Sequence, residues 1–222
     1  YSQRTIHTTY QELPADEHTV GLWHMNEGTD NSCSGGEDVC DSSGNSNDGT
    51  FSGTTFTTNS KLGDNATIFD GTNDYIQMAD SASLDINTAI TIEGWVYVTA
   101  SKDSTENQYF VDKQNLYSVI IEDDETITFY AKNLNTVSLT TTQTISLNNW
   151  HHLAVTYDST VGANNAKIYI DGNLSTEATR TNALGIDANP FRIGCYSNTD
   201  GACNLNWGMN GSADEVRISN IA

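Results

Sequence analysis

Basic residues are scarce in this chain of 222 residues. Lys and Arg together number 9 against 29 Asp and Glu, so the formal net charge is −20 at pH 7. A surface of this charge repels nucleic-acid phosphates and anionic lipid headgroups, so neither nucleic acid nor a membrane surface is expected as a partner. The charge is more typical of a protein kept soluble in salty or calcium-containing surroundings than of one particular ligand.

Long apolar runs and long helical patterns are missing too. No segment approaches the roughly 20 apolar residues of a membrane span, so no membrane insertion is expected. No signal-peptide pattern opens the sequence, and no convincing helical stretch exceeds two turns. We therefore expect a mature, exported fragment built from strands.

The four cysteines fall into two close pairs, each flanking a polar loop that contains glycine. Neither pair has CxxC spacing or a neighbouring histidine, so zinc is the less favoured alternative. Local disulfides are predicted between Cys33 and Cys40 and between Cys195 and Cys203. Two such bonds indicate an oxidising compartment, outside the cell or in a secretory lumen, and we expect an extracellular or cell-surface protein.

Segments rich in β-branched and aromatic residues follow one another along the chain, separated by turn sequences such as Asp70-Gly71. They cover residues 20–25, 66–69, 75–78, 90–98, 109–113, 117–121, 126–132, 152–157, 166–170, 191–194 and 213–218. In residues 90–98, aliphatic residues alternate with Glu93, Trp95 and Tyr97, which indicates a central strand with both faces covered or used. Eleven or more such strands predict an all-β fold, an antiparallel β-sandwich (jelly roll) of two packed sheets.

Six blocks of sequence carry a family resemblance. They are LWHMNEG at 22–28 with DSSGN at 41–45, FDG at 69–71 with DYI at 74–76, TIEGWV at 91–96, NWHHLAVTYD at 149–158, KIYIDGN at 167–173 and GSADEVRI at 211–218. In this order they resemble the laminin-G-like, concanavalin-A-like jelly-roll domains of exported adhesins and carbohydrate-active proteins. The resemblance implies one such domain over residues 19–222. It leaves unexplained the two cysteine-bracketed insertions and an N-terminal arm or linker at residues 1–18.

The segment CDSSGNSNDGT at residues 40–50 combines oxygen-bearing side chains with glycines. It is not an EF-hand, because Ser46 stands where that loop needs glycine and Ser52 where it needs a bidentate glutamate. The family resemblance implies instead a structural Ca²⁺ between a loop near the first strand and the aspartate that begins the last strand. The expected ligands are Asp41, Asn45, Asn47, Asp48, Gly49 and Asp214. In the alternative interpretation Asp41 and Asn45 form Asx-turns and Asp214 pairs with Arg217.

No catalytic set is expected. Jelly-roll glycan hydrolases resemble one another in projecting two carboxylates about 5 Å apart from alternate positions of one strand. The acidic cluster at residues 122–125 should lie instead at an exposed hairpin tip. His151 and His152 should point to opposite faces of a strand, one packed and one exposed, and Asp158 and Asp171 should lie in turns. No Ser-His-Asp set is expected, and the chain is not predicted to be an enzyme.

The second cysteine loop, CYSNTDGACNLNW at residues 195–207, is the most site-like segment apart from the calcium loop. It combines aromatic rings with the amides and carboxylates that bind sugar hydroxyls. The expected ligand-binding residues are Tyr196, Asn198, Asp200, Asn204 and Trp207. Alternatively, Trp207 covers the edge of the sandwich. Trp23, Trp95 and Trp150 lie in the family blocks and are expected to pack.

These features predict an extracellular, non-catalytic module for adhesion or carbohydrate recognition, with a glycan or a cell-surface protein as its partner. A different function is kept open by the arm, whose segment RTIHTTY at residues 4–10 has the alternation of a strand. Such a strand could add to the sheet of another copy and build a cell-surface filament or oligomer. The other interpretation of the arm is a linker, with Pro14 separating it from the domain.

Overall fold

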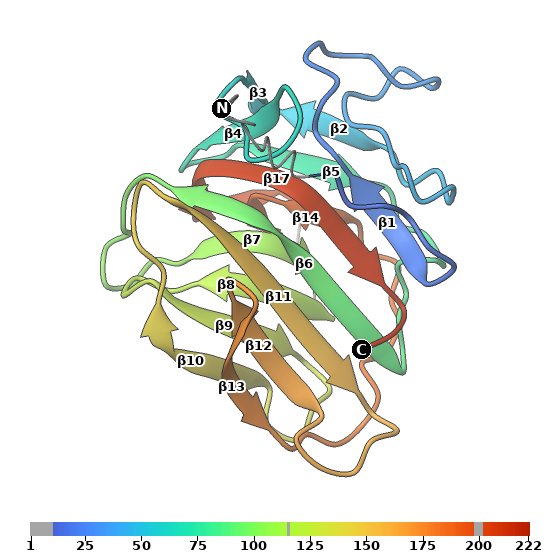
Figure 1. Ribbon diagram of the computed structural model, residues 1–222, viewed down its shortest axis with the longest axis vertical. Helices are drawn as coiled ribbons and strands as arrows, with labels where there is room; N and C mark the ends of the chain where they lie inside the picture. Colours follow the sequence, from blue (N-terminus) through green and yellow to red (C-terminus); the bar gives the residue numbers. More distant parts are fainter. Residues whose placement is uncertain (1–10, 115, 198–201) are drawn as a thin grey trace, which may run out of the picture.

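Two antiparallel sheets packed face to face form the body of the protein (Figure 1). The computed structural model describes residues 11–114, 116–197 and 202–222. The eight-stranded sheet has the order β13 (Asn173–Ala178), β12 (Ala166–Ile170), β11 (Trp150–Asp158), β6 (Ala89–Val98), β17 (Asn210–Ser219), β4 (Ala66–Asp70) and β3 (Thr55–Thr57), with β1 (Thr19–Trp23) also paired to β17.

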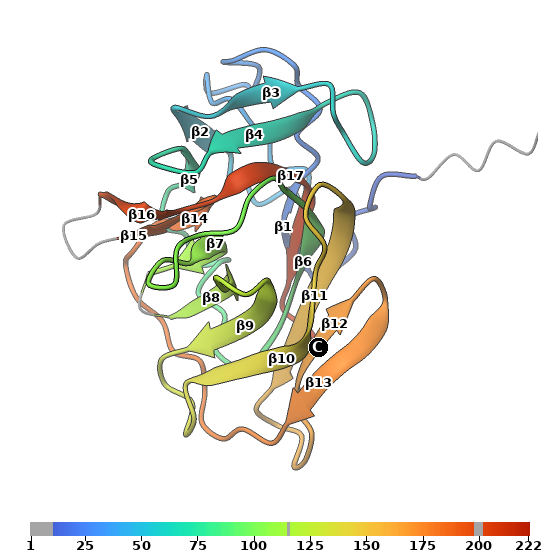
Figure 2. The ribbon, with the colours of Figure 1, turned by 90° about the vertical axis from the view of Figure 1, so that its left-hand side faces the viewer.

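The second sheet has seven strands and carries an attached hairpin (Figure 2). Its order is β10 (Ser138–Thr144), β9 (Thr126–Ala131), β8 (Tyr117–Ile121), β7 (Gln108–Lys113), β14 (Phe191–Ile193), β5 (Tyr75–Met78) and β2 (Gly49–Ser52). The hairpin pairs β15 (Cys195–Ser197) with β16 (Cys203–Gly208). The predicted all-β sandwich is confirmed. No helix that could span a membrane occurs in the described part of the chain.

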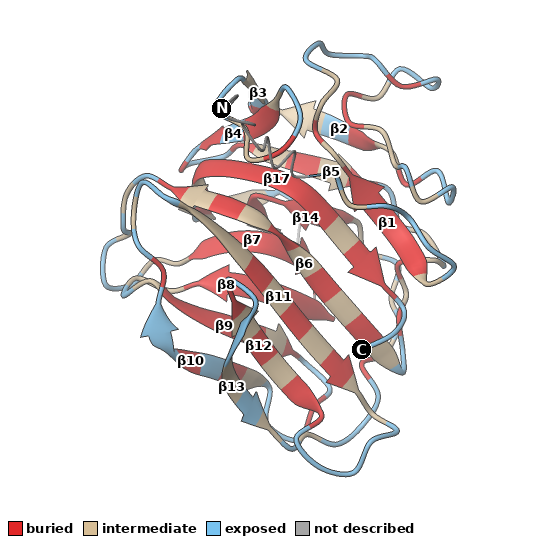
Figure 3. Cartoon of the chain, in the orientation of Figure 1, coloured by how far each residue is buried: buried red, intermediate tan, exposed pale blue. Residues whose placement is uncertain are grey.

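The core lies between the two sheets. Strands β6, β11 and β12 alternate buried and half-buried residues, seen as red and tan bands in Figure 3, because neighbouring side chains on a strand point to opposite faces. Trp23 of β1 stacks on Phe191 of β14 across the core, with ring centroids 5.5 Å apart. Trp23 therefore packs as expected. Trp95 and Trp150 are half-buried on the outer face of the eight-stranded sheet, where they contact His152 and Tyr97.

Strand β17 holds the first and last parts of the domain together. One edge pairs with β6, and the other is shared by β1 and β4. A bulge between Asp214 and Arg217 marks this change of partner, and Glu215 within it has a φ of 52°. The bulge contains two buried carboxylates, Asp214 and Glu215, which accept hydrogen bonds from backbone amides of neighbouring segments.

The N-terminal arm is described only from residue 11 onward, and those residues lie against β17. The Leu13 amide donates to Glu215 Oε2 at 2.8 Å, and Arg217 Nη1 donates to the Pro14 carbonyl at 3.1 Å. The strand-like segment at residues 4–10 lies outside the described residues. Assembly through that segment therefore stays a prediction.

Both predicted disulfides are present, Cys33 with Cys40 and Cys195 with Cys203. The Cα atoms are 5.4 Å and 5.9 Å apart, within the range that a disulfide can bridge. The first bond closes a loop beside β1, and the second closes the hairpin β15–β16.

A substitution at Gly94 can test how tightly the two sheets pack. A Cβ at this position of β6 would lie 2.8 Å from Phe110 Cζ and 3.2 Å from Val216 Cα, both in the core. Gly94→Ala should therefore lower the free energy of unfolding by about 1–3 kcal/mol, the usual cost of overpacking. Urea denaturation measures it. Gly162→Ala is the matched control, because its Cβ would meet nothing within 4 Å, and equal stability of the two variants would contradict this packing.

Candidate functional site

A row of polar side chains crosses the outer face of the seven-stranded sheet. Tyr130 of β9 is paired with Ser118 of β8, and Ser118 with Asp112 of β7. Asp112 is in turn paired with Arg192 of β14, which is paired with Gln77 of β5. Residues directly opposite on antiparallel strands share a face. Their chain neighbours point into the core, so the row is held on the outside.

The hairpin β15–β16 lies beside this row, next to β7 and β14 (Figure 2). It leaves β14 at Gly194, whose φ of 94° suits the change of direction, and the Cys195–Cys203 disulfide closes it. Three rings then pack together. Trp207 stacks on Tyr109 with centroids 5.9 Å apart, and Tyr196 contacts Trp207 at 4.9 Å and Tyr109 at 5.0 Å.

These elements enclose a cavity of about 230 Å³ on the outer face. Two tyrosines and two polar residues come from the sheet, and two aromatic rings come from the hairpin. The lining residues are Tyr109, Asp112, Ser118, Tyr130, Tyr196 and Trp207. We call this cavity the aromatic pocket. Four ring systems, one carboxylate and one hydroxyl can together contact an apolar ring face and bind polar groups at its edge.

Asp112 is buried at the base of the aromatic pocket and joins the sheet to the hairpin. Its Oδ1 accepts a hydrogen bond from Ser118 Oγ at 2.6 Å, and its Oδ2 accepts one from the Ser197 amide at 2.9 Å. Burial raises the pKa of Asp112 to about 6, although both hydrogen bonds and the charge of Arg192 act in the opposite direction. Burial also raises the pKa of Tyr109 and Tyr196, so both phenols stay neutral.

Sequence reasoning found only part of this pocket. Tyr196 and Trp207 line it, whereas Asn204 does not, and its Oδ1 accepts a hydrogen bond from the Asn206 amide at 3.2 Å. The other two expected ligand-binding residues, Asn198 and Asp200, lie outside the described residues. The pocket residues that were missed, Tyr109, Asp112, Ser118 and Tyr130, lie on strands. Their outward positions follow from strand alternation, but their convergence needed the pairing of β7, β8 and β9.

The predicted calcium loop is held by its own hydrogen bonds. The Asp41 carboxylate accepts from the amides of Leu22, Ser43 and Asn47 and from Ser43 Oγ, at 2.8–3.0 Å. Asp48 Oδ1 accepts from the Asp41 amide, and the side-chain amides of Asn45 and Asn47 both donate to the Val20 carbonyl. Gly49 begins β2 and exchanges backbone hydrogen bonds with Val39. The bond from the Ser43 amide to Asp41 is the expected Asx-turn, whereas the Asn45 side chain donates to Val20 and Ser43 and forms no Asx-turn among the described residues.

Asp214, the sixth expected calcium ligand, has different partners. Its Oδ2 accepts hydrogen bonds from the amides of Lys61 and Leu62, at 2.7 and 2.9 Å, while its buried Oδ1 has no hydrogen-bond partner. Burial raises the pKa of Asp214 to about 7. No hydrogen bond among the described residues joins Asp214 to residues 41–49. The alternative pairing with Arg217 is wrong, because Arg217 Nε donates instead to Glu93 Oε1 at 2.8 Å. The contacts do not favour one shared ion.

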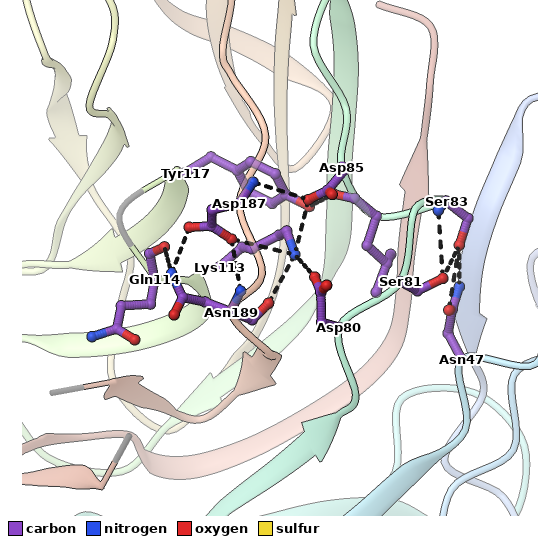
Figure 4. Close-up of polar contacts among 11 residues, drawn as sticks. Asn47, Asp80, Ser81, Ser83, Asp85, Lys113, Gln114, Tyr117, Asp187 and Asn189 are labelled. Atoms are coloured by element: carbon purple, nitrogen blue, oxygen red, sulfur yellow. Dashed lines mark hydrogen bonds and ion pairs between the residues drawn. The ribbon is translucent and has the colours of Figure 1, made fainter. Parts of the chain in front are cut away.

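A further acidic cluster surrounds the side-chain ammonium of a buried lysine (Figure 4). Lys113 of β7 is fully buried, and its Nζ lies 2.9 Å from Asp80 Oδ1, 3.2 Å from Asp85 Oδ1 and 3.7 Å from Asp187 Oδ1. It also donates to the Asn189 carbonyl at 2.9 Å. The ammonium therefore joins two loops to β7, and the hydrogen bond needed to satisfy a buried charge is present.

The acidic cluster at residues 122–125 forms the turn between β8 and β9, so the predicted hairpin tip is confirmed, but only Asp124 of the four residues is exposed and the other three are half-buried. Two other expectations are wrong. The side chains of His151 and His152 are 15% and 19% exposed, so both are mostly buried. A Ser-His-Asp set also exists: Ser146 Oγ lies 2.7 Å from His151 Nε2, and His151 Nδ1 lies 2.8 Å from Asp171 Oδ2.

This Ser-His-Asp set has the order of a catalytic triad, but its surroundings differ. Ser146 is exposed, and its own amide also donates to His151 Nε2, at 3.1 Å. Ser146 does not line the aromatic pocket. The contacts tie the loop before β11 to the turn between β12 and β13, and we assign the set to that structural role.

Comparison with known proteins identifies the family. The profile described as the concanavalin A-like lectin/glucanases superfamily matches residues 70–222. The chain belongs to this superfamily, as the sequence blocks predicted. No curated protein matches the sequence significantly.

Solved structures share the fold at low sequence identity. The binding domain of Paraclostridial Mosquitocidal Protein 1 is 15% identical with a TM-score of 0.70, over 92% of this chain and 49% of that one. Domain 4 of AbnA, an extracellular GH43 arabinanase from Geobacillus stearothermophilus, solved with arabinotriose, is 18% identical with a TM-score of 0.64, over 91% and 92%. A botulinum neurotoxin type C structure, from work on its two ganglioside interactions, is 13% identical with a TM-score of 0.62, over 92% and 48%. The chain thus spans about half the length of the toxin chains it matches.

The calcium ion stays a prediction, and thermal melts test it. If Ca²⁺ binds only the native protein, stability should rise by about 2.7 kcal/mol at a hundredfold excess over Kd, and Asp214→Asn should abolish the rise. Asp103→Asn is the matched control, since Asp103 is exposed. Identical melts of fully stripped protein with calcium and with EDTA would leave the loop at residues 41–49 as a hydrogen-bonded turn.

Proposed function

We propose that this chain is an extracellular, non-catalytic binding module that recognises carbohydrate, on a free glycan or on a cell surface, through the aromatic pocket. The observation that carries the proposal is the pocket itself. Four aromatic side chains surround a cavity that also presents the Asp112 carboxylate and the Ser118 hydroxyl. Sugar rings have one apolar face and polar edges, so this combination suits them.

The comparisons support a binding role. The similar structures include an arabinanase domain solved with arabinotriose, a botulinum neurotoxin type C whose cell entry depends on two ganglioside molecules, and the binding domain of botulinum neurotoxin DC in complex with rat synaptotagmin II. The two disulfides support an oxidising, extracellular setting. Adhesion follows where the recognised glycan belongs to a cell surface. A cell-surface protein is the alternative partner, since one similar toxin domain was solved with synaptotagmin II.

The non-catalytic part of the proposal rests on the pocket chemistry. Retaining and inverting glycosidases use a pair of carboxyl groups, about 5 to 10 Å apart. Asp112 is the one carboxylate among the six lining residues.

The Ser146, His151 and Asp171 set should also be inactive, so the purified protein should cleave no p-nitrophenyl acetate beyond the background rate. An esterase activity that Ser146→Ala removes would contradict both the non-catalytic proposal and the structural role assigned to Ser146.

Glycan binding is tested by a glycan array followed by calorimetry on the best ligand. Trp207→Ala should weaken binding roughly tenfold or more, because truncating a central aromatic contact costs about 2 kcal/mol. Tyr169→Ala is the matched control, since Tyr169 is a half-buried aromatic residue on β12 of the other sheet. Equal weakening by both variants, or by neither, would place the ligand elsewhere.

A further inference from the structure

The aromatic pocket combines two features that favour a positively charged group. Its walls are aromatic rings, and its base is a buried carboxylate, Asp112. The six lining residues include no Lys, Arg or His. The whole chain carries a formal charge of −20, so cations are drawn toward its surface.

The Asp112 carboxylate keeps acceptor capacity for a ligand. From the described residues, each of its oxygens accepts one hydrogen bond, from Ser118 or from Ser197, and a carboxylate oxygen has two lone pairs. In a buried site of low dielectric constant, the attraction between this charge and an ammonium group is much stronger than in water. A neutral hydroxyl there gains a charge-assisted hydrogen bond but no attraction between two full charges.

The aromatic walls act in the same direction. The faces of Trp and Tyr rings are electronegative and attract cations within about 6 Å of the ring centroid. Three of the rings form one packed group, Tyr109, Tyr196 and Trp207, and Tyr130 adds a fourth from β9. The cavity of about 230 Å³ is smaller than the roughly 300–1,000 Å³ of pockets for drug-sized ligands, so it suits one ring or one head group.

Two charged groups near Asp112 act in opposite directions. The positive charge of Arg192, which is paired with Asp112 in the sheet, opposes a further cation, and the negative charge of Asp187 favours one. Arg192 of β14 donates from Nε and Nη2 to Gln77 Oε1, and its guanidinium lies over the Tyr75 ring at 4.4 Å. Asp187 adds negative charge from the loop before β14. Lys113, the next residue along β7, points to the opposite side and is held by three aspartates.

We propose that the aromatic pocket recognises a positively charged ammonium group, carried by an amino sugar of the bound glycan. The proposal rests on the proposed glycan-binding function and narrows it to a class of sugar. The ammonium would lie against the aromatic rings and donate a hydrogen bond to the Asp112 carboxylate. A quaternary ammonium head group has no N–H to donate, but it shares the positive charge and the contact with the rings, so the experiment includes both sources.

The test compares two oligosaccharides with the same backbone by calorimetry at pH 6.5, one of glucosamine and one of N-acetylglucosamine. Acetylation removes the charge. The glucosamine oligomer should bind at least roughly tenfold more tightly, a difference of about 1.4 kcal/mol. Asp112→Asn, which keeps the shape of the side chain, should abolish the difference. Asp103→Asn, which removes an exposed charge, should preserve it.

Choline supplies the second source and a pH test, because its charge does not titrate. Burial places the pKa of Asp112 at about 6, and the ionised form is the one that attracts a cation. The affinity for choline should therefore be roughly tenfold lower at pH 5 than at pH 7.5, since about a tenth of Asp112 is ionised at pH 5. Asp112→Asn should remove this dependence. Near-ultraviolet circular dichroism checks that the variant keeps its aromatic packing.

The outcomes separate this inference from the proposed function. Equal affinity for the two oligosaccharides, or binding only of neutral glycans on the array, would overturn the ammonium inference and leave glycan recognition standing. Choline binding that depends on Asp112 without binding of either oligosaccharide would support the ammonium chemistry and overturn the amino sugar as its source. An Asp112→Asn variant that is folded and binds both ligands as the wild type does would also overturn the inference.

Discussion

The burial of two apolar sheet faces against each other is the constraint on which the rest of this structure depends. Trp23 stacked on Phe191 and the aliphatic residues around them hold the sheets together. Because side chains alternate along a strand, burying Phe191 sends its neighbour Arg192 to the outer face. The polar row of the seven-stranded sheet is thus a consequence of the core, and the aromatic pocket is built on that row.

Two adjacent residues of β7, Asp112 and Lys113, carry opposite charges and point to opposite faces of the sheet. Asp112 faces outward into the aromatic pocket, whereas Lys113 faces inward to three aspartates. Each charge is buried and each has polar partners, as buried charges require. Asp112 also gives the hairpin β15–β16 a fixed position through the Ser197 amide. The disulfide and the ring contacts hold the same hairpin, so the pocket wall is supported at several points.

Much of the fold could be predicted because its signals are local. Alternation in residues 90–98 predicted β6, and the acidic cluster at residues 122–125 was correctly placed in a turn. Six strands were missed, namely β2, β3, β10, β13, β15 and β16. Of these, β10 and β13 are rich in Thr, Ser and Asn and lack the apolar alternation. Loop composition identified Tyr196 and Trp207. It could not identify Asp112 or Ser118, each a single polar residue within an apolar strand whose role depends on partners elsewhere.

By itself the sequence determined the sandwich, the two local disulfides and the aromatic character of the second cysteine loop, because each depends on residues close together in the chain. Tertiary structure alone decided which side chains share a site. It joined Asp112 to Ser197, 85 positions away, and Ser146 to Asp171 through His151. It also gave Asp214 the amides of residues 61 and 62 as partners. Strand register and loop packing set these contacts, and both follow from how distant apolar faces are buried together.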